Sequence, residues 1–364
     1  DGQAVLDKSD YDSNVSRFDV SASPEQDQVT VRLNDSPAFR FHFTDEPRPV
    51  EVPGQTGEGA GGENQAASSR LSKVARAIAE AIEIGYRHFD CSPIYGNEPE
   101  IGQALSAAMD NGVLKREDFW VTSKLWNSDH LRGDVVPALK RTLADLRLDY
   151  LDLYLVHWPV AHRPGVGFPE NPEEFLSPDD APIAATWAGM EEALNAGLCK
   201  HIGVSNFSRK KIEALLQSAK LRPVANQVEC HPFLAQRGLL DYCNEQNIVL
   251  TAYSPLGSKD RPDFVKHDDE PGLLDSPVIL DIADKHGFTA GQVILAWALQ
   301  RNTSVIPKST NPGRLRENFA AAQITLDDGD MVAIDGMDRH YRFVDGTFWC
   351  PEGSPYTLEN LWDE

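Results

Sequence analysis

Short β-like runs alternate with longer helical patterns from about residue 69 onward, and this alternation restricts the possible folds more than any other feature. Seven runs have strand character: residues 86–90, 119–124, 151–157, 201–205, 224–229, 248–254 and 304–308. Between them, apolar residues recur every three or four positions, as in amphipathic helices. Repeated β-then-α units predict a parallel sheet covered by helices, and an eighth strand would close it into a (β/α)₈ barrel of the α/β class.

The first 68 residues follow a different pattern. The segment VTVRLNDSPAFRFHF predicts a hairpin followed by a strand, with the turn at LND. The Gly-rich residues 54–68 predict a flexible loop, because the glycines are not followed by the Lys-Ser/Thr pair of a phosphate-binding loop. We expect residues 1–27 to be a disordered acidic extension and residues 28–364 to form one barrel domain. Residues 338–364 would be a long C-terminal loop that contacts the substrate.

Composition and charge exclude several kinds of partner. The formal net charge of −22 argues against nucleic acid, whose binding needs a basic face. No run of about 18 apolar residues is present to span a membrane, and the first residues lack the basic and apolar regions of an export signal. The five cysteines include no Cys-x-x-Cys pair, so they predict neither a disulfide framework nor a zinc site. We expect a cytoplasmic protein with reduced thiols and no metal.

Four polar residues near the ends of three successive strand-like runs form the main candidate site. Asp90, Lys124 and His157 lie at the ends of these runs, and Tyr95 follows Asp90 by five residues. In a parallel barrel the carboxyl ends of the strands share one face, so these side chains should meet there. A neighbouring ammonium group favours the phenolate of a tyrosine, which makes its proton easier to give away. A carboxylate would hold the lysine and an imidazole would orient a carbonyl oxygen, so the four residues together predict carbonyl reduction.

Several longer segments resemble the aldo-keto reductase superfamily. They run from about residue 70 to about residue 338 and read GYRHFDCSPIYGNEPEIGQAL, LYLVHWP, IGVSNF, NQVECHP and IPKSTNPGRLREN. The resemblance implies a (β/α)₈ barrel that binds NADPH in extended form without a Rossmann domain. It also implies that Tyr95 is the general acid in reduction and the base in oxidation. Lys124 would lower the pKa of this tyrosine, Asp90 would fix the lysine, and His157 would orient the carbonyl.

The resemblance also implies a cofactor site. Ser205, Asn206 and Gln227 match positions that bind the carboxamide, and Tyr253 matches the residue that stacks on the nicotinamide ring. Ser254, Leu256 and Ser258 match the stretch along the pyrophosphate. Lys308, Ser309 and Arg314 match the 2′-phosphate site, and Glu317 and Asn318 match the adenine contacts. Two cations and a hydroxyl near a helix N-terminus suit a dianionic phosphate. We therefore expect NADPH or NADP as the cofactor, with NADH binding more weakly.

One part of the chain departs from the family pattern. Members usually carry a Gly-Thr-aromatic segment at the end of the first barrel strand, and this sequence has none. The nearest equivalent is FRFHFTDEP, in which Thr44 matches the threonine while Phe43 and Asp45 replace the glycine and the aromatic residue. This leaves one wall of the substrate pocket undefined. Trp126 and Trp158 are candidates for substrate contacts, and core packing is the alternative for each.

These features predict an NADPH-dependent reductase of aldehyde or ketone carbonyls, including aldoses or sugar-derived aldehydes. One alternative is a nucleotide-binding regulatory or structural barrel without useful turnover, which the altered first strand favours. Another is an NADP-dependent polyol or alcohol dehydrogenase. We expect the partner to be a small carbonyl compound and the protein to be a monomer or a weak dimer, as family members often are.

Overall fold

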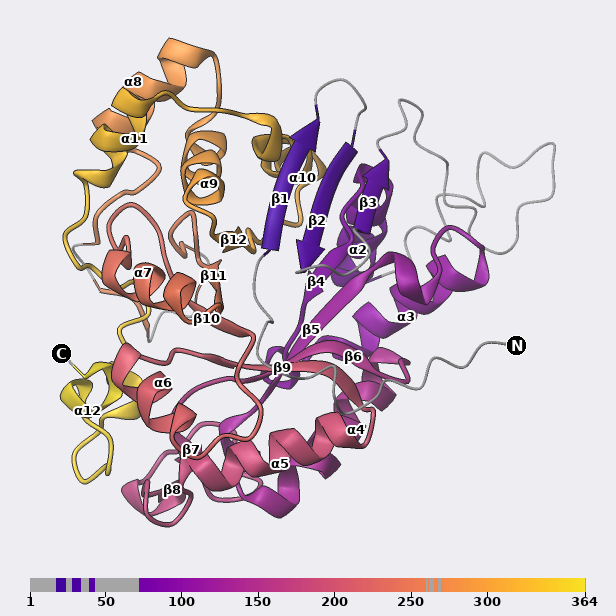
Figure 1. Ribbon diagram of the computed structural model, residues 1–364, viewed down its shortest axis with the longest axis vertical. Helices are drawn as coiled ribbons and strands as arrows, with labels where there is room; N and C mark the ends of the chain where they lie inside the picture. The colour runs from indigo at the N-terminus through magenta and orange to yellow at the C-terminus, as the bar shows by residue number, and fades with distance from the viewer. Residues whose placement is uncertain are drawn as a thin grey trace.

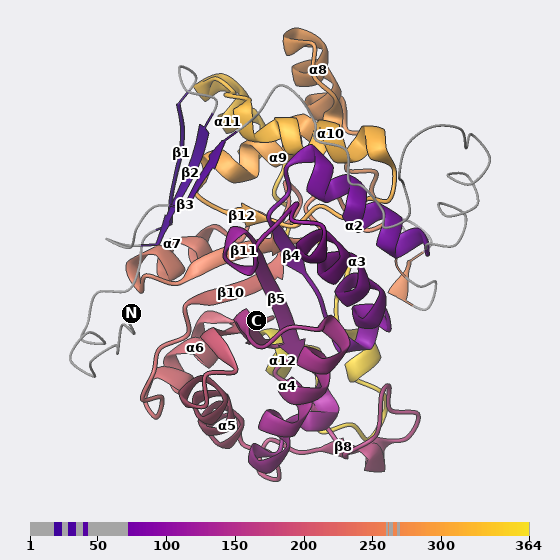
Figure 2. The ribbon, with the colours of Figure 1, turned by 90° about the vertical axis from the view of Figure 1, so that its right-hand side faces the viewer.

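The computed structural model describes residues 72–259, 261, 265–267 and 270–363, together with the backbone of three N-terminal strands. These strands, β1 (Phe18–Ser23), β2 (Gln28–Leu33) and β3 (Phe39–His42), form an antiparallel sheet of their own in the order β1-β2-β3. Figures 1 and 2 show it as a separate layer at the outside of the molecule. Thr44 and residues 54–68 lie outside the described residues.

Seven parallel strands form the central sheet, in the order β12-β11-β10-β9-β6-β5-β4. Their bounds are β4 His88–Asp90, β5 Trp120–Leu125, β6 Leu151–Val156, β9 Cys199–Ser205, β10 Ala225–Glu229, β11 Val249–Tyr253 and β12 Ser304–Val305. Every residue of β6 is buried, as expected for a strand that is covered on both faces. The strands curl around one another at the centre of the molecule (Figure 1).

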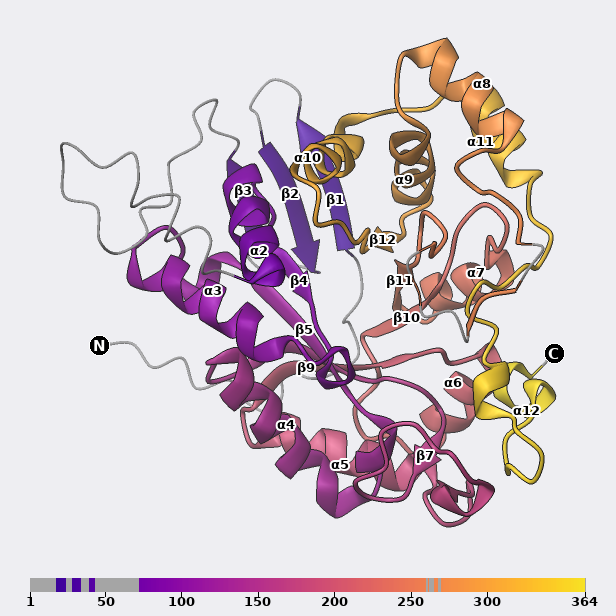
Figure 3. The ribbon, with the colours of Figure 1, turned by 180° about the vertical axis from the view of Figure 1, so that it is seen from behind.

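Helices surround the curled sheet on its outside (Figures 1 and 3). Their bounds are α2 Lys73–Ile84, α3 Glu98–Asp110, α4 Arg132–Leu146, α5 Ile183–Asn195, α6 Arg209–Leu216, α7 Arg237–Glu245, α8 Pro277–His286, α9 Ala290–Gln300, α10 Pro312–Ala320, α11 Asp328–Asp335 and α12 Leu358–Trp362. Helix α2 illustrates how the sequence sets the ends. The Ser72 hydroxyl accepts the Ala75 N–H at 3.1 Å, and Gly85 ends the helix with a φ of +119°, which a side chain would disfavour.

The structure confirms the predicted α/β class and the repeated β-then-α order. All seven predicted strands are present, with ends that differ by up to three residues, and β12 is reduced to Ser304–Val305. The expected eighth strand is not among the strands that the structure describes, since β3 pairs with β2 and not with the edge strands β4 or β12. The strand β1 lies within residues 1–27, and each of its six residues pairs with one of β2. The predicted boundary between an N-terminal extension and the barrel domain stays a prediction.

Composition also gave expectations about membrane-spanning segments and cysteine pairing. No helix within the described residues is long and apolar enough to cross a membrane. All five cysteines are free, and four of them are buried. A short hairpin that the sequence did not predict, made by β7 (Ala161–His162) and β8 (Phe175–Leu176), stands in the loop after β6.

Candidate active site

A buried ion pair links the neighbouring strands β4 and β5. The Nζ atom of Lys124 contacts Oδ1 of Asp90 and also donates to the Cys91 carbonyl at 3.0 Å. The Lys124 side chain is 0% exposed. Burial by itself lowers the pKa of this lysine, but the charge and hydrogen bond of Asp90, together with the nearby Tyr95 and Cys91, hold the pKa above its ordinary value. Lys124 is therefore a fixed positive charge.

Gln227 on β10 completes the contacts of Asp90. Its Nε2 donates to the second carboxylate oxygen, Oδ2, at 2.7 Å. Both oxygens of Asp90 thus have partners, which prevents the carboxylate from turning away from Lys124. The sequence assigned Gln227 to the cofactor carboxamide, and the structure gives it this additional contact across the barrel.

Tyr95 stands beside the lysine in the short 3₁₀ turn η2 (Pro93–Tyr95). The Nζ atom of Lys124 lies 5.3 Å from the centre of the phenol ring. Burial raises the pKa of Tyr95 and Lys124 lowers it, and the result lies above the ordinary value. The expected sign of the lysine effect is thus correct, but the expected net lowering is not found, because desolvation is larger. Since the residue is 52% exposed, solvent limits the size of this upward shift.

His157 follows β6 and faces Tyr95, with ring centres 6.1 Å apart and nearly perpendicular planes. Its Nδ1 lies 3.1 Å from the Oγ of Ser92. Burial lowers the pKa of His157 well below its ordinary value, and the charge of Lys124 lowers it further. The imidazole is therefore neutral at physiological pH and can donate one hydrogen bond.

The residues expected at the nicotinamide end form a continuous network behind the tetrad. Asn206, with a φ of +63°, donates from Nδ2 to the His157 carbonyl at 2.9 Å and accepts the Tyr253 hydroxyl at 2.8 Å. Ser205 donates to the Gln227 carbonyl at 2.7 Å. These bonds fix the Tyr253 ring through its hydroxyl, which suits a residue that would stack on a flat heterocycle.

The other predicted cofactor residues lie in the segment after β11 and around the start of α10. Ser254, Leu256 and Ser258 are partly exposed in the segment after β11. Lys308 and Ser309 precede α10, and Arg314 lies in its first turn, where its backbone N–H is capped by the side chain of Asn311 at 3.0 Å. Glu317 is exposed and Asn318 half-buried on the same helix. The candidate phosphate site is thus solvent-facing and positively charged at its lysine and arginine.

Aromatic residues from separate loops pack together next to His157, and we call them the aromatic wall: Trp126, Trp158, Phe168, Phe348 and Trp349. The ring of Trp126 lies 5.1 Å from that of His157. Trp349 contacts Trp126, Trp158 and Phe168 at centre distances of 5.9, 5.8 and 5.6 Å. Both predicted tryptophans are buried in this cluster, so each combines core packing with a position beside the tetrad.

The C-terminal segment that carries Trp349 is tied to the barrel. The buried carboxylate of Glu229, at the end of β10, accepts the backbone N–H groups of Phe343 at 2.6 Å and Val344 at 2.9 Å. Further along, the Tyr356 hydroxyl accepts the N–H of Ala161 and donates to the carbonyl of Leu176, both at 2.9 Å. The segment is therefore held over the loop after β6.

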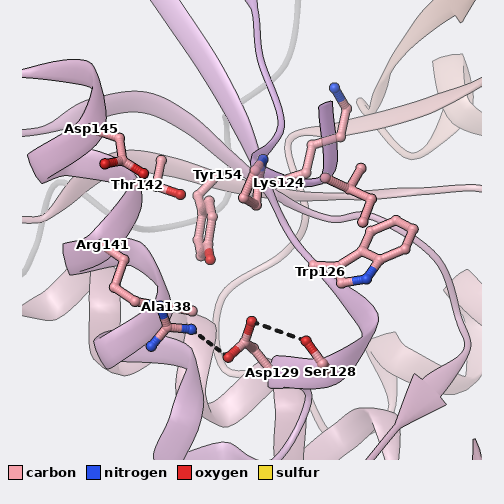
Figure 4. A pocket seen from close by; sticks show the side chains of 11 residues that line it. Lys124, Trp126, Ser128, Asp129, Ala138, Arg141, Thr142, Asp145 and Tyr154 are labelled. Atoms are coloured by element: carbon pink, nitrogen blue, oxygen red, sulfur yellow. Dashed lines mark hydrogen bonds and ion pairs between the residues drawn. The ribbon is translucent and has the colours of Figure 1, made fainter. Parts of the chain in front are cut away.

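A pocket of about 250 Å³ lies on the helix side of β5. It is lined by Pro93, Ile94, Lys124, Trp126, Ser128, Asp129, Ala138, Arg141, Thr142, Asp145 and Tyr154. Figure 4 shows the Tyr154 phenol and the Asp129 carboxylate pointing toward one another, with the Asp129–Arg141 ion pair (2.6 Å) beside them. The pocket therefore adjoins Lys124 and the η2 turn from behind.

One group of side chains in the described residues has the arrangement of metal ligands. His286, Asp327 and Asp330 place ligand atoms within 4.8 Å of one another. Lys285 contacts both aspartates, at 2.6 and 2.8 Å, and His286 contacts Asp330 at 2.6 Å. Lys285 and His286 on α8 thus pair with Asp327 and Asp330 at the start of α11, and these contacts link the two helices.

Sequence reasoning missed two contributors to the site. The Ser92 hydroxyl touches His157, and the Cys91 carbonyl accepts from Lys124. Both stand in the DCSPIY segment between Asp90 and Tyr95, so their closeness to the tetrad was a visible signal. Their partners were not visible, because these lie 65 and 33 residues further along the chain.

The strand ends of this parallel, barrel-type sheet carry a buried lysine–aspartate pair, a tyrosine and a neutral histidine. This arrangement is that of an α/β oxidoreductase. Residues 57–339 match the aldo/keto reductase family. The chain is 56% identical to Aldo/keto reductase slr0942 of Synechocystis sp. (strain ATCC 27184 / PCC 6803 / Kazusa), over 80% of this chain and 89% of the relative. It is 44% identical to Aldo-keto reductase family 1 member A1 of Mus musculus, over 76% and 85%.

The chain belongs to the aldo/keto reductase family. The seven-stranded sheet agrees with the (β/α)₈ barrel of this family. Family members generally use nicotinamide cofactors and act on small carbonyl compounds.

Proposed function

We propose that this protein reduces aldehyde or ketone carbonyls to alcohols with NADPH, and that aldoses or sugar-derived aldehydes are among its substrates. The observation that carries the proposal is the buried Asp90–Lys124 pair beside Tyr95. A lysine held charged in a desolvated position stabilises the phenolate that remains when a tyrosine gives up its proton. No other group next to the tetrad combines these properties among the described residues.

Each residue of the tetrad has one task in the proposed reaction. The nicotinamide, when bound, supplies the hydride that reduces the carbonyl carbon. Tyr95 gives its hydroxyl proton to the carbonyl oxygen, and Lys124 stabilises the resulting phenolate. Asp90 keeps the lysine charged and in place. His157 donates a hydrogen bond that orients the carbonyl, which favours the reacting geometry.

The residues present suit a dinucleotide with a 2′-phosphate. Ser205, Asn206 and Gln227 would hold the carboxamide, and the Tyr253 ring would stack on the nicotinamide. Lys308, Ser309 and Arg314 would hold the 2′-phosphate, because cations at the first turn of a helix favour a dianion. Ser254, Leu256 and Ser258 would follow the pyrophosphate, and Glu317 and Asn318 the adenine.

Since the cysteines are unpaired, we also propose that the protein acts in the cytoplasm.

Turnover and binding together test this proposal. The loss of NADPH absorbance with a panel of aldehydes and ketones measures reduction, and the reverse reaction with NADP and polyols measures oxidation. Reduction faster than oxidation supports the reductase. Tight NADPH binding without turnover on any substrate would instead support a regulatory barrel, and faster oxidation of polyols would support a dehydrogenase.

Cofactor preference has its own test in Arg314→Ala. A charge-assisted hydrogen bond contributes about 1.5–3 kcal/mol, so the Kd for NADPH should rise about 10- to 100-fold while that for NADH changes little. Titration of the intrinsic tryptophan fluorescence with each cofactor measures both constants. Arg316→Ala, on the same helix but paired with Glu80 at 3.7 Å, is the matched control and should leave both nearly unchanged. Equal losses for the two cofactors at Arg314 would refute the phosphate assignment.

A further inference from the structure

Ser92 is placed to control the hydrogen-bonding state of His157. It is completely buried directly before the η2 turn that carries Tyr95. Its Oγ lies 3.1 Å from Nδ1 of His157, which is the only hydrogen bond of this hydroxyl among the described residues. The two side chains therefore form an isolated pair inside the protein.

The direction of this hydrogen bond follows from counting donors and acceptors. If Nδ1–H donated to Ser92, the serine hydroxyl hydrogen would have no acceptor within the described part of the chain, and a buried donor without a partner is costly. If Ser92 donates to Nδ1, both groups are satisfied and the proton of the neutral imidazole resides on Nε2. The second arrangement is therefore favoured.

The surroundings of His157 hold the ring so that this pairing persists. Its backbone N–H donates to the Leu125 carbonyl at 3.1 Å, and its carbonyl accepts from Asn206. Trp126 and Tyr95 pack edge to face against the ring. Besides Tyr95, Lys124 and His130 lie close enough to act on the ring electrostatically, and both disfavour an imidazolium. The imidazole ring of His157 therefore stays neutral and keeps one orientation.

We propose that Ser92 is a positioning residue that fixes the Nε2–H tautomer of His157 and thereby makes this histidine a hydrogen-bond donor to the substrate oxygen. The inference rests on the proposed carbonyl reduction for its role in turnover. In the other tautomer, the Nε2 lone pair would face the lone pairs of the carbonyl oxygen and repel them. Ser92 thus links the turn that carries the proton donor to the group that orients the carbonyl.

The tautomer is directly measurable without turnover. Long-range proton–nitrogen NMR spectra of the full chain labelled with ¹⁵N-histidine distinguish a protonated ring nitrogen from an unprotonated one, and His157→Gln identifies the signals of this residue. We expect an unprotonated Nδ1 and a protonated Nε2 at neutral pH. A proton on Nδ1, or on both nitrogens, would overturn the inference. Because this measurement needs no substrate, it holds whether or not the protein reduces carbonyls.

Kinetics test the consequence for catalysis. Ser92→Ala should lower kcat about tenfold, the size expected for one lost hydrogen bond, with the NADPH Kd unchanged, while Ser92→Thr should restore most of the loss. Ser123→Ala is the matched control: it removes another fully buried hydroxyl, bonded to Glu98 at 2.6 Å, and should leave both kcat and the His157 signals unchanged. An alanine variant with the kcat of the parent, or a threonine variant no better than alanine, would contradict the proposal.

Discussion

The polar layer of the site and the aromatic wall beside it are built from different parts of the chain by different interactions. The polar layer consists of Asp90, Lys124, His157, Asn206 and Gln227, which lie on or directly after strands of the central sheet and are joined by hydrogen bonds and an ion pair. The aromatic wall comes from loops and the C-terminal segment, and its rings contact one another at 4.6 to 5.9 Å.

This difference predicts different responses to substitution. In the polar layer, removing one atom leaves a buried charge or donor without a partner. In the aromatic wall, a ring can be replaced by another apolar side chain of similar volume at modest cost. The polar layer should therefore determine whether the reaction occurs, and the aromatic wall which substrates enter. The four predictions that follow test this division.

Tyr95→Phe should produce the largest effect. It removes the proton donor but keeps the ring beside Lys124 and His157, so kcat should fall about 10³-fold, within the range for general acid catalysis. NADPH affinity and the unfolding midpoint should stay close to those of the parent. Steady-state kinetics, cofactor titration and urea unfolding measure these three quantities. A variant that keeps more than a tenth of the activity would remove Tyr95 from its assigned role.

Asp90→Asn should destabilise the polar layer. It leaves Lys124 without its counter-ion in a fully buried position, which costs about 3–5 kcal/mol of unfolding free energy. Asp129→Asn is the matched control, because Arg141 in that ion pair is 62% exposed and such pairs contribute about 1 kcal/mol or less. Urea unfolding of both variants measures the difference. Similar losses would mean that the polar layer gains nothing from its burial.

Glu98 lies on the outer side of the polar layer, where its buried carboxylate accepts the Ser123 hydroxyl at 2.6 Å. Burial raises its pKa from 4.5 to about 7. The folded state therefore holds this proton more tightly than the unfolded chain, and stability should fall as pH rises from 4.5 to about 7. Relative to Glu98→Gln, the fall should approach about 3 kcal/mol.

Urea unfolding of the parent and of Glu98→Gln at several pH values gives this difference directly, since the other titrating groups are common to both. The two stability curves should diverge across that pH interval and run parallel above it. Curves that stay parallel throughout would show that Glu98 keeps an ordinary pKa, and that the outer side of the polar layer is as well satisfied as the inner side.

The same division separates what the sequence could predict from what it could not. The tetrad was predictable because strand order in a parallel barrel brings the ends of successive strands to one face, whatever the details of packing. The Asp90–Gln227 contact, between residues 137 positions apart, depends on how the sheet curls and was not visible. Nor was the position of Trp349, which is set by contacts of Glu229 and Tyr356 with distant backbone groups. Local patterns predict elements, while closure of the barrel and docking of the tail arise from tertiary packing.

Phe168→Ala should have the smallest effect and act only through the aromatic wall. Phe168 is 48% exposed and stacks on Trp349 with planes 6° apart, so its loss should cost little stability. An aromatic contact contributes about 0.5–1.5 kcal/mol, so KM for an aromatic aldehyde should rise about 2- to 10-fold while kcat stays constant. A short aliphatic aldehyde, which cannot reach this ring, is the control substrate and should keep its KM. A fall in kcat with both substrates would show that the aromatic wall also positions the polar layer, and the two regions would then have to be treated as one.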